Sequence, residues 1–220
     1  MPGTFISFEG SEGCGKSTQF DLLAGRLREA GATVMTSREP GGTAIGEEIR
    51  RLLQFSREGH HLAAESELLL FAASRAQLVR EVIVPALADT KIVLCDRFLD
   101  SSAVYQGVAR GLNADAVRAI NAFAVGATMP DVTLLFDLPP DVARARLLRR
   151  PRPVGQPVDR MECEPPEFYE RVRAGYLALA EREPDRFVVL DASLTKEDVA
   201  QSVWNTVSPR LHGLLPGNCA

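Results

Sequence analysis

Five short apolar runs along the chain predict the strands of a sheet. Three of them are nearly continuous rather than alternating, as expected of parallel strands that helices cover on both faces. Helical patterns fill the segments between them, and alternating strand and helix implies right-handed crossovers and a parallel α/β sheet. The expected strands are Thr4–Glu9, Ala32–Glu39, Lys91–Asp96, Asp131–Asp137 and Arg186–Asp191.

Six segments carry helical patterns. The first begins at Ser17 and ends at Gly31, a residue suited to the position just after a helix. The second is long and rich in apolar residues. The expected helices cover residues 17–31, 64–89, 113–127, 139–150, 165–183 and 195–207.

Each of the five runs ends in an acidic residue, and these ends would meet at one edge of the sheet. Ligands of open α/β sheets bind beyond the carboxyl ends of the strands, so some of these acids lie where chemistry would occur. Helix capping is the alternative, and we assign it to Asp137 and Asp191. The other three acids are Glu9, Glu39 and Asp96.

Length and composition indicate one ordinary globular domain over residues 1–220, with a tail over 212–220 that is expected to fray. The chain has 220 residues, of which 45% are hydrophobic and 25% charged, enough for a sizeable core. A net charge of −4 argues against a nucleic-acid partner. No apolar run could span a membrane and no signal-peptide pattern opens the chain, which predicts a cytoplasmic protein with no membrane partner.

Cysteine spacing does not predict a metal cluster or a disulfide framework. No pair has C-x-x-C spacing, and none lies beside a histidine. The four cysteines are Cys14, Cys95, Cys163 and Cys219.

A glycine-rich stretch follows the first expected strand and precedes the first expected helix. It fits G-x-x-x-x-G-K-[ST], the phosphate-binding loop, in the context that this motif requires. Backbone N–H groups of such a loop face phosphate oxygens, Lys16 supplies positive charge, and the Ser17 hydroxyl can ligate Mg²⁺. The chain is therefore expected to bind a nucleoside triphosphate with Mg²⁺. The loop residues are Gly10, Ser11, Glu12, Gly13, Cys14, Gly15, Lys16, Ser17 and Thr18.

Two further groups of side chains bear on the acceptor of the phosphate. Phe71 and Arg75 are four residues apart on one expected helix, so a ring and a guanidinium could together hold a base; an ordinary amphipathic boundary is the alternative. Arg97, Ser101 and Tyr105 have the same spacing directly after the strand that ends in Asp96. They would bring charge, hydroxyl and phenol to the carboxyl edge of the sheet.

Arginines gather between residues 149 and 160, among prolines and a glycine. A solvated loop is one interpretation. A flap that closes on phosphates is the other, because arginines suit the dispersed charge of a transferring phosphoryl group. The four arginines are Arg149, Arg150, Arg152 and Arg160.

Taken in order, "FEGSEGCGKST", "REPGGT", "ELLLFAASRAQ", "DRFLDSSAVYQG" and "DRME" resemble bacterial thymidylate kinase, a nucleoside monophosphate kinase. The resemblance covers about residues 5–183. It implies transfer of a phosphoryl group from ATP to dTMP, with magnesium as cofactor. It also implies a P-loop fold with a five-stranded parallel sheet flanked by helices, and a homodimer.

The resemblance implies roles for the side chains at the nucleoside end. Phe71 would stack on thymine, and Arg75 and Gln106 would hydrogen-bond its edge. Tyr105 would crowd the 2′ position of the sugar, and Glu12 would approach the 3′-hydroxyl.

The resemblance implies a second set of roles at the phosphate end. Arg50, Arg97 and Ser101 would hold the acceptor phosphate, and Arg97 would act in catalysis together with Lys16. Asp96 would help to position the acceptor or the magnesium that Ser17 binds.

The flap matches the lid of the family, about residues 149–163. The glycine loop has no arginine, which is typical of the bacterial type whose catalytic arginine lies in the lid. The flap is longer than the common form, and we favour Arg160, in "DRME", as the catalytic arginine, with Arg149 and Arg152 as alternatives. Cys14 stands where alanine is usual in the family.

Two other functions fit the phosphate-binding loop alone. A deoxynucleoside kinase would need a carboxylate base for a 5′-hydroxyl and little arginine for an acceptor phosphate, so Arg50 and Arg97 argue against it. Another P-loop NTP-binding protein, such as a switch, would not need Phe71, Arg75 and the lid.

Overall fold

Five parallel strands form the sheet of the computed structural model, in the order β2-β3-β1-β4-β5. The structure describes residues 3–55, 62–149, 160–211 and 213–215. The predicted fold class and all five predicted strands are confirmed. The strands are β1 (Thr4–Glu9), β2 (Val34–Arg38), β3 (Ile92–Asp96), β4 (Val132–Asp137) and β5 (Phe187–Asp191).

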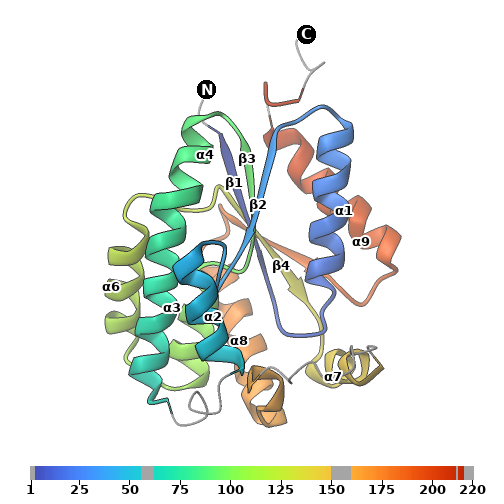
Figure 1. The fold of residues 1–220 in the computed structure, drawn as a ribbon. Helices are drawn as coiled ribbons and strands as arrows, with labels where there is room; N and C mark the ends of the chain where they lie inside the picture. Colours follow the sequence, from blue (N-terminus) through green and yellow to red (C-terminus); the bar gives the residue numbers. More distant parts are fainter. Residues whose placement is uncertain (1–2, 56–61, 150–159, 212, 216–220) are drawn as a thin grey trace.

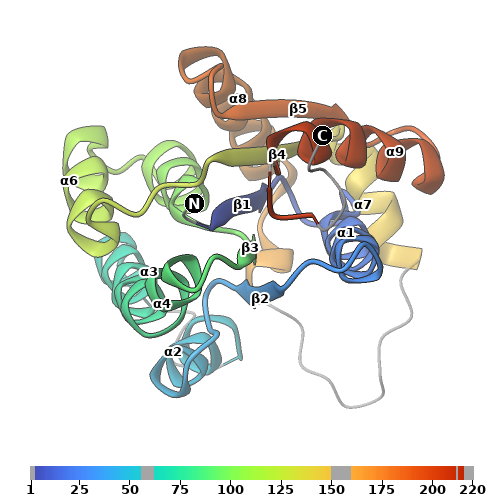
Figure 2. The ribbon, with the colours of Figure 1, turned by 90° about the horizontal axis from the view of Figure 1, so that it is seen from above.

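Helices cover both faces of the sheet (Figures 1 and 2). The helices α1 and α9 pack together on one face, while α3, α4 and α6 cover the other. The α-helices are α1 (Lys16–Glu29), α2 (Ala44–Phe55), α3 (Ala64–Leu78), α4 (Val84–Ala88), α5 (Leu99–Ser102), α6 (Ala114–Val125), α7 (Pro140–Arg149), α8 (Pro166–Arg182) and α9 (Lys196–Val207). Shorter helical turns are η2 (Val79–Ile83), η3 (Ala103–Ala109), η4 (Arg160–Cys163) and η5 (Ser208–Arg210).

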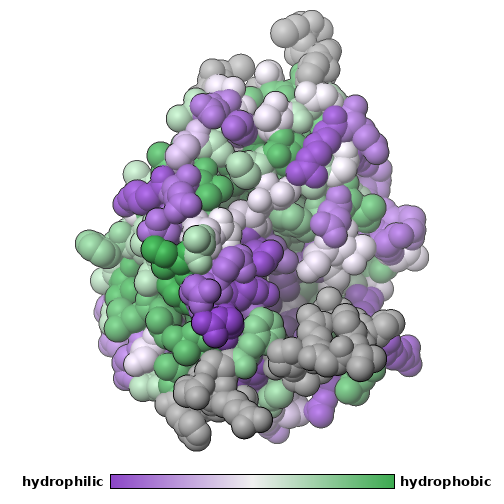
Figure 3. Space-filling model, in the orientation of Figure 1, coloured by the Kyte–Doolittle hydropathy of each residue, from purple (hydrophilic) through white to green (hydrophobic). Residues whose placement is uncertain are grey.

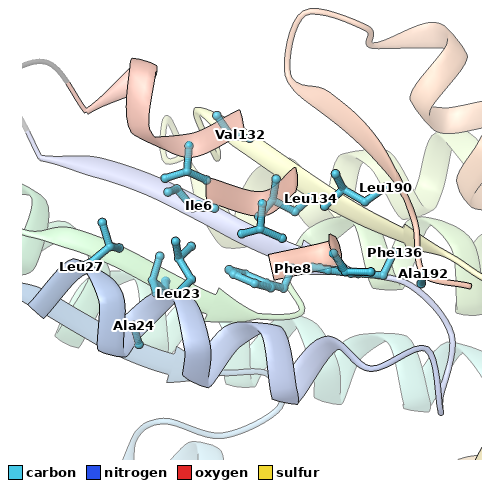
Figure 4. Packing of buried hydrophobic residues seen from close by; sticks show 14 of the residues in the cluster. Ile6, Phe8, Leu23, Ala24, Leu27, Val132, Leu134, Phe136, Leu190 and Ala192 are labelled. Carbon is cyan, nitrogen blue, oxygen red and sulfur yellow. The ribbon is translucent and has the colours of Figure 1, made fainter. Parts of the chain in front are cut away.

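Burial on both faces explains why the strands read as continuous apolar runs. Ile6 and Phe8 of β1 are fully buried, and their cluster includes Leu23 and Leu27 of α1 (Figure 4). The rings of Phe8 and Phe136 stack with centroids 5.7 Å apart. The sheet is therefore held rigidly at the end where the phosphate-binding loop leaves β1.

Two helical features differ from the sequence-based expectation. The helix α2 was not anticipated, because "REPGGT" was interpreted only as a motif. The helix expected over 64–89 is divided by a π-helical turn, η2. A second π-helical turn, η3, follows α5, so the regular four-residue spacing assumed after β3 does not hold throughout.

Two of the sequence expectations fall partly outside the described residues. One is the predicted lid, most of which, residues 150–159, lies outside the described residues. In the tail expected to fray, Leu214 and Leu215 pack against the core cluster. None of the helices within the described ranges is long and apolar enough to cross a membrane.

Candidate active site

The loop between β1 and α1 has the backbone of a phosphate cradle. Gly13 lies at φ 77°, and a Cβ there would come within 2.4 Å of the carbonyl oxygen of Ala143. Gly15 lies at φ 91° and would meet nothing within 4 Å, so its side faces open space at the start of α1. Glycine is favoured at both positions because L side chains rarely adopt positive φ.

Lys16 and Ser17 begin α1 at this cradle. The Lys16 ammonium group donates to the carbonyl oxygens of Gly10 (3.0 Å) and Ser11 (2.9 Å), so it lies across the loop. Ser17 is exposed and donates from its hydroxyl to Asp96 Oδ2 over 3.3 Å. Register places Asp96 beside Phe8, next to the point where the loop begins.

Oxygen atoms suited to a hard cation line the same cavity as Ser17. Asp96 Oδ1 and Glu39 Oε1 are both buried, and neither has a hydrogen-bond partner among the described residues. Unpaired buried carboxylate oxygens are costly, and a divalent cation bound here would satisfy them. The arrangement of Ser17 and Asp96 fits the predicted magnesium site, and Glu39 adds a carboxylate that the sequence analysis did not assign to it.

A cavity of about 410 Å³ lies over the loop. Arginines line it from several elements, and guanidinium groups suit phosphates, although four carboxylates share the same wall. The predicted Arg50 and Arg97 are among them. The arginines that line it are Arg38, Arg50, Arg97 and Arg146.

A second, smaller cavity continues from the first toward α3 and η3. The two cavities share Glu12, Gln54 and Arg97 in their walls. The structure therefore places most of the predicted nucleoside-end residues next to the phosphate cavity. The predicted residues that line the second cavity are Glu12, Phe71, Arg97, Ser101, Tyr105 and Gln106.

Glu12, Arg97 and Tyr105 form one hydrogen-bonded group where the cavities meet. Glu12 accepts from Arg97 over 2.6 Å and from the Tyr105 hydroxyl over 2.7 Å. Burial opposes ionisation of Glu12, but Arg97 and then Lys16 prevail and lower its pKa. Arg97 lies at φ 69°, a strained conformation for a non-glycine residue. This backbone conformation costs free energy, and it keeps the Arg97 guanidinium over the loop.

Ser101 is held by a buried carboxylate behind the cavity. Its hydroxyl donates to Glu9 Oε2 over 2.7 Å and accepts from Arg97 over 3.2 Å. Glu9 also accepts from the backbone N–H of Phe98 and from the Tyr176 hydroxyl, and burial followed by the charge of Asp100 raises its pKa. In this structure the Ser101 hydroxyl orients the Arg97 guanidinium. Ser101 would therefore act on an acceptor phosphate through Arg97.

Arg75 is fully buried and does not line the second cavity. It donates to Glu39 (2.8 Å), Asn121 (2.7 Å) and Ser102 (2.9 Å). Ser102, which accepts from Arg75, does line the cavity. The expected direct contact of Arg75 with a base is not what this geometry favours, because its guanidinium is committed to internal acceptors.

Arg160 differs most from its expected place at the phosphates. It is 9% exposed, and it donates to the carbonyl oxygen of Leu53 over 3.1 Å and to the carboxylate of Glu67. Unlike Arg146, it does not line the cavity over the loop. In this structure Arg160 anchors η4 to α2 and α3, and its contact with the phosphates stays a prediction from the sequence. The two alternatives expected from the sequence are Arg149, which is exposed at the end of α7, and Arg152, which lies outside the described residues.

Glu67 collects several donors on the far side of the second cavity. It accepts from Gln106 over 2.7 Å, from Arg110 over 3.3 and 3.4 Å, and from Arg160. Arg110 also donates to Glu164 over 2.5 Å. We call these five residues the Glu67 cluster: Glu67, Gln106, Arg110, Arg160 and Glu164.

Comparison with known proteins agrees with this geometry. The sequence model described as thymidylate kinase matches residues 8–203. The chain belongs to the thymidylate kinase family. It is 49% identical over 198 residues to the thymidylate kinase of Desulfosudis oleivorans, covering 89% of this chain and 92% of that one. Its identity to the thymidylate kinase of Synechococcus sp. (strain JA-3-3Ab) is 46% over 214 residues, 96% of this chain and 98% of the other.

A solved structure supports the same assignment. The thymidylate kinase of Ehrlichia chaffeensis superposes with a TM-score of 0.75 at 34% identity, covering 94% of this chain and 99% of that chain. The fold of this chain is thus that of a P-loop kinase of the thymidylate kinase family.

Several lining residues of this thymidylate kinase family member were missed by the sequence analysis. Arg38 ends β2, and its place at the carboxyl edge of the sheet was an available signal. Arg146 belongs to an arginine-rich helix before the flap, which was a weaker signal. Ser102 and Met161 lie within the quoted motifs and line the second cavity, but nothing in their type distinguished them from their neighbours.

Proposed function

We propose that the protein transfers the γ-phosphoryl group of ATP to dTMP and yields ADP and dTDP. The observation that carries the proposal is the joining of two cavities through Glu12, Gln54 and Arg97. One has the phosphate-binding loop and four arginines in its wall, and the other has the ring of Phe71 and the polar side chains of η3. Membership of the thymidylate kinase family supports the same reaction.

Arginines and Lys16 stabilise charge at the phosphate end. An acceptor phosphate is ionised at neutral pH, so catalysis needs positioning and electrostatic stabilisation rather than a strong base. Arg97, held by Glu12 and Ser101, would orient the acceptor phosphate, and Arg50 would support it. Lys16 would leave its loop carbonyls to face the transferring group.

Magnesium would be held by Ser17 and Asp96, with Glu39 close by. Bound magnesium supplies charge neutralisation between the outer phosphates. The two unpartnered buried oxygens, on Asp96 and Glu39, support this assignment. Glu39 has a pKa raised to about 7 by burial, against the opposing effect of Arg75, so a nearby cation would favour its ionised form.

The nucleoside end recognises a deoxyribonucleoside with a pyrimidine base. Phe71 offers a ring to the base, and Ser102 accepts from Arg75 and can donate its own hydrogen into the cavity. We propose that Arg75 acts on the base through Ser102. Tyr105 is fixed by its bond to Glu12 and would exclude a 2′-hydroxyl, while Glu12 would receive the 3′-hydroxyl.

Deoxynucleoside kinase activity is the second candidate, and the arginines of the acceptor site argue against it. A coupled assay of ADP release separates the candidates, with dTMP, thymidine or no acceptor present. We expect turnover with dTMP alone. Turnover with thymidine would favour the second candidate, and equal release without an acceptor would indicate a hydrolase or switch.

A homodimer is also proposed, through α3 and α6. These helices pack together, and Leu69 of α3 is 55% exposed while Phe123 of α6 is 89% exposed. Hydrophobic residues gather on the surface over these helices in Figure 3. A cytoplasmic location remains a prediction from the sequence.

A further inference from the structure

The amide of Gln106 has a fixed orientation in the Glu67 cluster. Gln106 lines the second cavity from η3 and is 1% exposed. Its Nε2 donates to Glu67 Oε1 over 2.7 Å. A carboxylate has only acceptors and an amide nitrogen has only donors, so the nitrogen is the atom that faces Glu67. The carbonyl oxygen of Gln106 is thereby left for a ligand in the cavity, since no described residue donates to it.

Glu67 is locked in place as an acceptor. It is 1% exposed, and Arg160 and Arg110 supply two guanidinium groups to its carboxylate. Burial opposes its ionisation, but the hydrogen bond from Gln106 and the charges of Arg110 and Arg160 lower its pKa. At neutral pH Glu67 is therefore ionised, and the Gln106 amide keeps the one orientation in which its nitrogen faces Glu67.

We propose that Glu67 is a positioning residue for base specificity, because it turns the Gln106 carbonyl oxygen toward the base. Thymine and uracil present an N3–H donor that this oxygen can accept. Cytosine presents a lone pair at N3, which the oxygen repels. The proposal rests on the proposed function, and it places selection between pyrimidines on a residue that does not touch the base.

Glu67→Gln tests the proposal, because it keeps the shape and replaces one acceptor by a donor. The NH2 groups of Arg110 and Arg160 both donate to Glu67 Oε2, so the new carbonyl oxygen would take this position. The new amide nitrogen would then face Gln106, at the cost of the 3.3 Å bond from Arg110 Nε to Oε1. Gln106 would then accept with its oxygen and turn its nitrogen toward the cavity. That arrangement suits N3 of cytosine and opposes N3–H of thymine.

The measurement is kcat/KM for dTMP and for dCMP, with the ratio of the two as the readout. We expect the ratio to fall at least about tenfold in Glu67→Gln. A purely structural role would lower both values alike, and a ratio within about threefold of the unmutated protein would overturn the proposal. Glu164→Gln is the matched control, because Glu164 binds Arg110 but not Gln106, and it should leave the ratio unchanged.

A double mutant separates Glu67 from its neighbours. In a Gln106→Met background, Glu67→Gln should cause no further change in the ratio. A shift that persists without Gln106 would overturn the proposal. Failure of the proposed function is seen earlier, since the unmutated protein would then release no ADP with dTMP.

An NMR measurement on the unmutated protein covers the case in which Glu67→Gln does not fold. The side-chain NH₂ signals of Gln106 are assigned by their loss in Gln106→Met. We expect them to keep their positions when dTMP binds, because they stay bonded to Glu67. A large shift of these signals on binding, as for a nitrogen that turns to the base, would overturn the proposal.

Discussion

The phosphate end and the nucleoside end of the site are built in different ways. At the phosphate end, nine consecutive residues that run from the end of β1 into the first turn of α1 supply the cradle, the lysine and the serine. At the nucleoside end, the polar groups are buried side chains that act on one another across α3, η3 and η4. A local motif can be interpreted residue by residue, whereas a buried network assigns roles only once its partners are known.

Lys16→Ala should have the largest effect, because it removes charge from the phosphate end. We expect kcat to fall at least about 100-fold, since the loss of one preorganised donor to a developing charge costs about 3 to 4 kcal/mol. The fold should survive, because the ammonium group bonds only to loop carbonyls and the Cys14 sulfur among the described residues. Turnover and thermal melting check both points.

Lys196→Ala is the matched control, because this lysine is exposed on α9 away from the cavities. It should leave kcat unchanged. A Lys16→Ala protein that keeps more than about a tenth of normal turnover would contradict the role of the loop in catalysis.

The free energy of unfolding should depend on pH through Glu39, which lies between the phosphate end and the nucleoside end of the site. Its pKa is raised to about 7, so between about pH 4.5 and 7 the folded state holds a proton that the unfolded state has lost. The free energy of unfolding therefore falls as pH rises through this window and is constant above it. Relative to Glu39→Gln, the unmutated protein should lose about 3 kcal/mol between pH 4.5 and pH 8.

Urea unfolding at several pH values measures this difference. Glu47→Gln is the control. Burial opposes the ionisation of Glu47, but the hydrogen bond from the backbone N–H of Gly42 and the pairing with Arg38 together lower its pKa. Its contribution is lost only as pH falls below about 4.5. Parallel curves for the unmutated protein and Glu39→Gln from pH 5 to pH 8 would show that Glu39 ionises normally.

Arg160→Ala tests which end of the site Arg160 serves. Because Arg160 binds Glu67 and the Leu53 carbonyl, its loss should loosen the nucleoside end and raise KM for dTMP about tenfold. The value of kcat should stay within about threefold, since the residue does not line the phosphate cavity. Steady-state kinetics at saturating ATP separate the two parameters, and a large loss of kcat with unchanged KM would restore the lid role expected from the sequence.

The sequence was sufficient for the fold and for the position of the phosphate-binding loop. Continuous apolar runs ending in acids predicted all five strands, and the spacing of Lys16 and Ser17 after a strand predicted their places. It was not sufficient for Arg75 and Arg160, because a guanidinium can face a ligand or a buried carboxylate with equal chemical sense. Arg75 and Arg160 face the buried carboxylates of Glu39 and Glu67. These two residues lie 36 and 93 positions away from them along the chain.

The helix α2 and the turn η3 were missed for a related reason. Residues 44–55 carry helical spacing, but their neighbours had been interpreted only as a motif. The π-helical turn changes the register after Ser102, and no local signal in "SSAVYQG" distinguishes it from an α-helix. In the folded chain η3 packs against α8, a contact that the local sequence does not reveal.

The smallest expected effect is the difference in kcat/KM between dTMP and dUMP. It separates the contribution of burial from that of hydrogen bonding at the nucleoside end. The base of dUMP lacks only the methyl group of thymine, and burial of one such group contributes about 0.8 kcal/mol, or about fourfold in kcat/KM. Its N3–H and 4-oxo groups match the Gln106 carbonyl and the Ser102 hydroxyl as well as those of thymine do. In dCMP the N3 lone pair faces the Gln106 carbonyl oxygen, a mismatch that should cost at least about tenfold. Measured under one condition, kcat/KM should therefore fall in the order dTMP, dUMP, dCMP. If dCMP were used better than dUMP, the hydrogen bond that the Gln106 carbonyl oxygen accepts from the base could not be what selects it, and the nucleoside end would discriminate by shape alone.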